Sequence, residues 1–97
     1  SPVCNVNAFP HDDAFFYDRK LVIDGAQYPY YRLSTIPSLA SLAGLPVTVF
    51  PTGRRAAFGA PIGLQVMGAF LEDRTTIRFA RLVEAEFGGF TPPPGFE

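Results

Sequence analysis

The side chains that could carry out catalysis are few in this sequence, and they do not form a complete set. Serines stand at positions 1, 34, 38 and 41, and Lys20 is the only lysine. A serine nucleophile needs a neighbouring base and a pocket of hydrogen-bond donors for the oxyanion. Three of the serines fall in one predicted helix, none stands in a glycine-rich turn, and Lys20 falls in a predicted hairpin. The residues alone therefore predict no hydrolytic centre.

The single histidine and its neighbours offer a second kind of chemistry. His11 is followed by Asp12 and Asp13, and Cys4 is the only cysteine. Neighbours in sequence do not face one ion as a metal site or triad requires, so a solvated loop is the favoured interpretation. A weak metal site, or a small enzyme built on these residues, is the alternative. Cys4 is expected to be a small buried hydrophobe that forms no internal disulfide.

Composition narrows the range of partners. The chain has 97 residues, a hydrophobic content of 47% and a net charge of −1, which indicate one globular domain without a basic surface for nucleic acid. No apolar run approaches the ~20 residues that a membrane span needs, and the first residues do not resemble a signal peptide. No phosphate-binding glycine motif is present. We therefore expect a cytoplasmic protein without a cofactor or a membrane or nucleic-acid partner.

The elements that would position these side chains follow from turn and capping residues. Asp24-Gly25 suits a tight two-residue turn, which predicts a hairpin over residues 20–28. A first helix is predicted over residues 31–44, with Ser34 or Thr35 as N-cap and Gly44 at its end. Further elements are predicted as strands over 46–50 and 62–68, a loop over 51–61, a helix over 71–87 with Asp73 as N-cap, and an extended tail over 88–97.

This order of elements indicates an α/β fold with a partial mixed β-sheet and two main covering helices. The strands are mostly apolar, as expected of a sheet buried on both faces. Two helices cannot easily cover both faces, so the chain is predicted to be part of something larger or to associate. The aromatic clusters around residues 15–17 and 28–31 are typical of a core or an interface.

The stretch from Ser41 to Glu84 resembles the C-terminal segment of the amidase signature family. That family ends with an A-G-L-P strand, a P-x-G loop, a G-x-P-x-G-x-Q strand and a D-x-x-x-[LI]-x-x-A helix. Here these motifs are Ala43–Pro46, Pro51–Gly53, Gly59–Gln65, and Asp73 with Ile77 and Ala80. Upstream, the "SPV…NAFPHD" segment and the "VIDGAQYPYY" hairpin are similar to the family's segments before this helix. The likeness covers nearly the whole chain.

The resemblance implies a carboxamide hydrolase of the Ser-cisSer-Lys type. In that family the catalytic lysine, the serine in a cis peptide and the nucleophilic serine all lie upstream of the segment matched here, and Lys20 does not match the context of that lysine. Residues 1–97 are therefore expected to be the C-terminal portion of an amidase signature domain, without catalytic residues and inactive alone. Ser34 stands where amidotransferase members usually carry an acidic residue, which favours a general amidase.

Gln65 is the one residue to which the resemblance gives a role. It is expected to support the active site of the parent enzyme by pointing toward segments absent from this chain. Without those partners, we expect its amide to face solvent, a water or a second chain, because a buried unpaired amide costs about 1–3 kcal/mol. The alternative to an amidase fragment is a non-enzymatic module that self-associates through exposed sheet edges, as a homo-oligomer.

Overall fold

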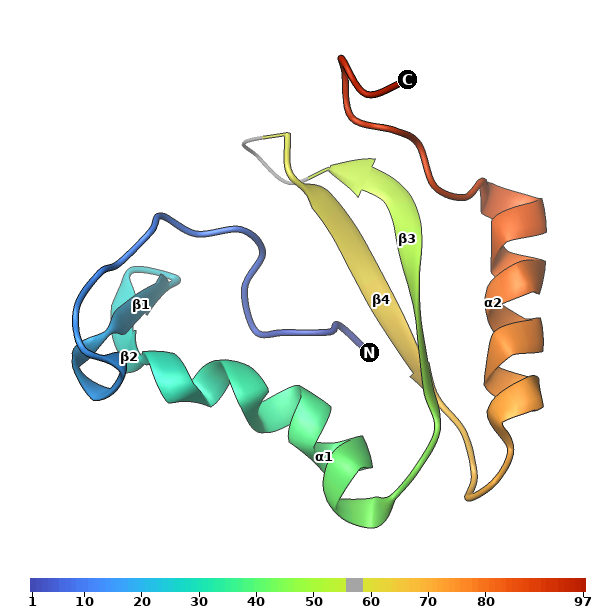
Figure 1. Ribbon diagram of the computed structural model, residues 1–97, viewed down its shortest axis with the longest axis horizontal. Coiled ribbons are helices and arrows are strands. Elements are labelled where there is room, and N and C mark those ends of the chain that lie inside the picture. The colour runs from blue at the N-terminus through green and yellow to red at the C-terminus, as the bar shows by residue number, and fades with distance from the viewer. Residues whose placement is uncertain (56–58) are drawn as a thin grey trace.

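The computed structural model describes residues 1–55 and 59–97, which form two hairpins and two main helices (Figure 1). Strands β1 (Lys20–Ile23) and β2 (Ala26–Pro29) make the first hairpin, and β3 (Val47–Arg55) and β4 (Pro61–Met67) the second. The helices are α1 (Thr35–Ala43) and α2 (Asp73–Phe87). Two short 3-10 turns, η1 (Phe16–Asp18) and η2 (Tyr30–Ser34), flank the first hairpin, and residues 88–97 follow α2 without helix or strand.

The α/β class and the two main helices are confirmed, but the prediction of a mixed sheet is wrong. Each hairpin forms its own two-stranded antiparallel sheet, and no parallel pair occurs in the described residues. A parallel pair requires a long crossover between neighbouring strands. Here α1 carries the chain away from the first hairpin, so the two pairs stay apart (Figure 1).

The predicted hairpin turn and helix end are confirmed by backbone geometry. Asp24 and Gly25 have φ angles of 50° and 79°, as a turn with two left-handed residues requires. Gly44 ends α1 at φ 64°, and its N–H bonds back to the last turn.

Ser34 stands at the N-cap position of α1, as one of the two predicted alternatives, but its side chain makes no capping bond; the predicted N-cap of α2, Asp73, is wrong by one residue. Ser34 has helical backbone angles, and its hydroxyl donates to the Tyr31 carbonyl, so it caps nothing at the start of α1. The preceding residues form η2 instead of a first helical turn. Asp73 is already inside α2, with Glu72 in the flanking position. The Glu72 carboxylate is engaged by the Thr75 hydroxyl at 2.6 Å.

Strand β3 is longer than predicted, because residues 51–55 of the predicted loop continue it. Residues 56–58 of that loop lie outside the described residues. A register shift between Pro51 and Arg55 and a φ of 69° at Gly53 let the strand pass through residues that normally interrupt it. Proline and glycine therefore bend this strand without ending its pairing.

Helix α2 covers one face of the second hairpin. Its contact is centred on Thr76, which is 2% exposed and accepts a hydrogen bond of 2.9 Å from the Thr48 hydroxyl on β3. Further along, the rings of Phe50 and Phe79 meet edge to face. On the opposite face Val49 is 57% exposed, Val47 and Met67 are 37% and 36% exposed, and Gln65 is buried.

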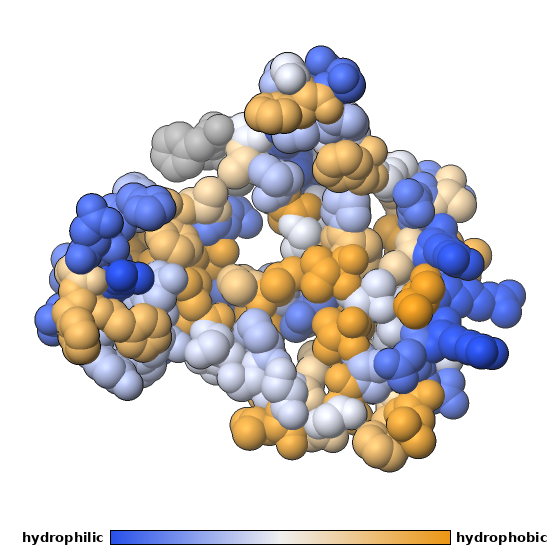
Figure 2. Space-filling view, in the orientation of Figure 1, coloured by the Kyte–Doolittle hydropathy of each residue, from blue (hydrophilic) through white to orange (hydrophobic). Residues whose placement is uncertain are grey.

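The core is small for a chain of this length. Leu21 and Ala40 are the buried apolar side chains among the described residues. The Cα radius of gyration is 15.5 Å, whereas about 12.5 Å is expected for a compact domain of 97 residues. The surface area is 7579 Å², about 2100 Å² more than the roughly 5500 Å² expected for a folded monomer of this size. Apolar side chains are spread across the surface (Figure 2).

Candidate functional site

Gln65 lies at the centre of β4 and is 5% exposed, so the prediction that it faces solvent, a water or a second chain is wrong. Its side-chain Nε2 donates to the Ser1 hydroxyl at 3.2 Å. The main chains of the two residues also bond to each other, from Gln65 N to Ser1 O and from Ser1 N to Gln65 O, both at 2.9 Å. The partner is thus supplied by the chain itself, from 64 residues away.

The first residues of the chain add to the edge of β4. Pro2 forms an antiparallel bridge with Leu64. Gly63 lies next to this segment, since a Cβ at that position would be in ordinary van der Waals contact with Val3 at 3.9 Å. Gln65, which the family resemblance marks as a support residue, therefore anchors a short third segment of this sheet. Its role beside an active site stays a prediction.

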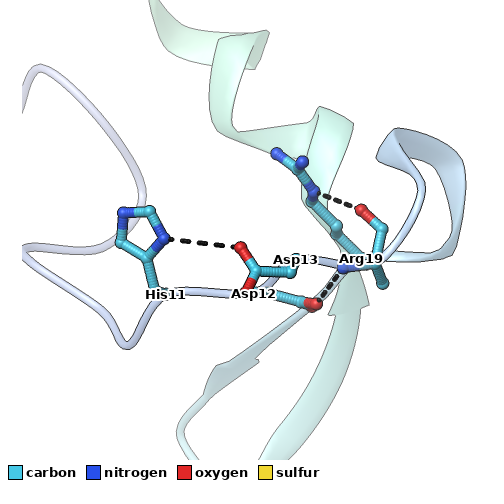
Figure 3. Close-up of polar contacts among 5 residues, drawn as sticks. His11, Asp12, Asp13 and Arg19 are labelled. Carbon is cyan, nitrogen blue, oxygen red and sulfur yellow. Dashed lines mark hydrogen bonds and ion pairs between the residues drawn. The ribbon is translucent and has the colours of Figure 1, made fainter.

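His11, Asp12 and Asp13 do not converge on one site (Figure 3). His11 Nδ1 and Asp13 Oδ1 are 3.8 Å apart, and both side chains are fully exposed. The Asp12 carboxylate bonds to the nearby main chain instead, where its Oδ1 accepts from the Ala14 N–H at 2.9 Å. Arg19 Nε donates to the Ala14 carbonyl at 2.8 Å, which ties the loop to the start of β1. The arrangement is that of a solvated loop.

The serines and the lysine are also separated in the described residues. The hydroxyls of Ser34, Ser38 and Ser41 each donate to a carbonyl of the preceding turn and are not paired with a base. Lys20 is exposed at the start of β1, in the first hairpin. Cys4 is half-buried and free. This geometry carries no nucleophile with an adjacent base. No three His, Cys, Asp or Glu side chains gather around a common point in residues 1–55 and 59–97.

A groove that the sequence interpretation missed lies along the far end of β3. It has a volume of about 630 Å³ and is lined by residues 49–51, 53–55 and 61–63 and by the tail after α2. Arg54 and Arg55 line it together with the apolar side chains of Phe50 and Phe90. The sequence held one signal for this groove, the adjacent arginine pair between two apolar strands. The tail that also lines the groove comes from 35 residues further on, so its approach could not be predicted.

None of the helices among the described residues is long and apolar enough to cross a bilayer. No protein-family model matches the chain.

Individual curated proteins do match part of it. The chain is 43% identical over 54 residues to a glutamyl-tRNA(Gln) amidotransferase component from Anaeromyxobacter sp. (strain K), a stretch that covers 56% of this chain and 11% of that protein. It is 41% identical over 56 residues to fatty-acid amide hydrolase 2 of Homo sapiens, covering 58% of this chain and 10% of that protein. Fatty-acid amide hydrolase 2-A of Danio rerio is 40% identical over 53 residues, which cover 55% of this chain and 10% of that protein.

The chain spans about a tenth of the length of the curated relatives it matches. Amidotransferase and fatty-acid amide hydrolase relatives match with similar identity, so the preference for a general amidase drawn from Ser34 stays a prediction. Both kinds of relative are members of one family. Over a little more than half of its length, this chain is therefore related to the amidase signature family.

Proposed function

We propose that this chain supplies the C-terminal part of an amidase signature carboxamide hydrolase and does not hydrolyse amides by itself. The observation that carries the proposal is the identity of 40% or more to amidotransferase and amide hydrolase relatives over 53–56 residues. The separation of serines and lysine in the described residues supports the second half of the proposal, because a serine without a base is a weak nucleophile.

The exposed surface supports the same proposal. A folded monomer of this size is expected to expose roughly 5500 Å², whereas this chain exposes 7579 Å². Here Leu42 on α1 is 88% exposed, and Leu82 and Phe87 on α2 are mostly exposed as well. These side chains are accounted for if further segments of an amidase domain pack against both helices.

A chimera tests the proposal. In human fatty-acid amide hydrolase 2, the matching 56-residue segment is replaced by the corresponding segment of this chain. We expect the chimera to fold and to hydrolyse a fatty-acid amide, since the recipient provides the catalytic groups. The same recipient without the segment is the control and is expected to be insoluble or inactive. A soluble chimera with a cooperative thermal transition and no activity would contradict the proposal, as would amide turnover by the 97-residue chain alone.

The second candidate function is a self-associating module. It is favoured by the apolar side chains on one face of the second hairpin, where Val49 is 57% exposed and Val47 and Met67 are partly exposed. Unpaired strands with apolar faces readily associate. Multi-angle light scattering of the purified chain tests this, with Val49→Thr as a variant that reduces the apolar area. A monomer at high concentration argues against it, whereas a dimer that weakens in Val49→Thr supports it.

A further inference from the structure

The groove along the end of β3 is built by residues from three parts of the chain. Strand β3 is irregular at the bulge after Pro51 and at the left-handed Gly53, where a Cβ would lie 3.9 Å from the Phe87 carbonyl oxygen at the end of α2. The tail after α2 runs past the end of β3 (Figure 1), and its Phe90 and Pro93 line the groove. At about 630 Å³, the groove has the size of a small-molecule site.

The walls of the groove are mostly apolar. The rings of Phe50, Pro51, Pro61, Phe90 and Pro93 line it. Aromatic rings pack well against such flat faces in stacked or edge-to-face arrangements. A planar apolar ligand is therefore suited to this groove.

The charged side chains that line the groove have one sign. Arg54 and Arg55 line it, and no acidic side chain of the described residues does. Glu84 lines the adjoining hollow between β3 and α2 instead. Arg55 Nη1 donates to the Gly59 carbonyl at 2.9 Å, which holds this guanidinium in place. Neither arginine has a carboxylate within 4.0 Å in the described part of the chain.

We propose that this groove binds a small aromatic carboxylate, with the carboxylate at Arg54 and Arg55 and the ring between Phe50 and Phe90. A guanidinium matches a carboxylate in both charge and hydrogen-bonding geometry. The opposite end of the ligand needs no polar partner, because the rest of the lining is largely apolar. The groove is formed by this chain alone, so binding does not depend on the proposed amidase function.

Titration of the 97-residue chain with 2-naphthoate tests the proposal. Amide chemical shifts are followed by NMR, and we expect saturable shifts at Gly63, Gly89 and Thr91, which line the groove. The neutral isostere 2-naphthamide is expected to bind at least about fivefold more weakly, since it lacks the charge. Equal affinity of the two ligands would overturn the proposal, as would shifts that do not saturate.

Paired variants separate the arginines from general charge effects. Arg54→Gln with Arg55→Gln is expected to weaken 2-naphthoate binding at least about fivefold and to leave 2-naphthamide binding unchanged. The matched control, Arg74→Gln with Arg78→Gln, removes two charges from α2 outside the groove and should leave both ligands unaffected. Equal weakening in the two double variants would overturn the proposal. If the first double variant does not fold, Phe90→Ala, on the exposed tail, is expected to weaken both ligands, and unchanged binding refutes the site.

Discussion

One pair of threonine hydroxyls links α2 to β3. We predict the loss of stability that follows when this pair is removed. Thr48 Oγ1 donates to Thr76 Oγ1 at 2.9 Å, and Thr76 Oγ1 donates onward to the Asp73 carbonyl, also at 2.9 Å. Thr76 is 2% exposed, so water cannot replace either bond. Thr76→Val keeps the shape of the side chain and removes both hydrogen bonds.

The expected cost follows from what each substitution leaves unpaired. Thr76→Val leaves the half-buried Thr48 hydroxyl without its acceptor, which is expected to lower the free energy of unfolding by about 1–3 kcal/mol. Thr48→Val removes only one bond, because Thr76 still donates to Asp73, and should cost about 0.5–1.5 kcal/mol. In the double variant the shared bond is lost once and no hydroxyl is left unpaired. We therefore expect it to be no less stable than Thr76→Val.

Urea unfolding followed by far-UV circular dichroism measures these differences. With a slope of about 1–3 kcal/mol per molar urea, a loss of this size moves the midpoint by roughly 1 M. The coupling energy from the four proteins is expected to be about 0.5–1.5 kcal/mol. Strictly additive single effects, or a Thr76→Val variant as stable as the parent, would refute the inference that this hydroxyl pair joins the helix to the sheet.

Three further substitutions test other contacts by the same unfolding assay or by amide exchange. Gly68→Ala places a Cβ 2.7 Å from the Thr76 methyl carbon, so we expect a loss of about 1–3 kcal/mol; an unchanged midpoint would show that α2 can shift without cost. Leu21 is 3% exposed in the first hairpin, and Leu21→Ala is expected to lower the free energy of unfolding by about 2–5 kcal/mol. It should abolish amide protection in β1 and β2 while β3 and β4 keep theirs, and a uniform loss of protection would contradict separate hairpin units. Gln65→Leu removes only the 3.2 Å bond to Ser1, so a change within about 1 kcal/mol is expected, and a larger loss would indicate a stronger partner for the amide.

The sequence predicted those features that depend on local chemistry. Asp24-Gly25 defines its hairpin and Gly44 ends its helix because both depend on backbone angles that few residues adopt. The extension of β3 through Pro51 and Gly53 was not predictable in this way. It depends on pairing with Pro61 and Gly63, which overrides the local tendency of proline and glycine to interrupt a strand.

The candidate sites also include features that neighbouring residues determine and features that distant residues determine. That His11 and its neighbours form an exposed loop follows from their adjacency, and the structure agrees. The burial of Gln65 required knowing that Ser1 returns to β4, and the groove required knowing where residues 89–93 cross β3. Contacts across so many residues leave no periodic or spacing signal in a single sequence.

The distribution of exposed apolar surface bears on the two proposed functions. About 2100 Å² of surface beyond that of a compact monomer is more than twice the roughly 800 Å² that one partner buries in a standard interface. The large apolar side chains that are exposed lie on both helices, both hairpins and the tail. A two-fold dimer covers a single patch on each copy. Segments that wrap around both helices would cover more of this surface, so its distribution favours the remainder of an amidase domain over a second copy of the chain.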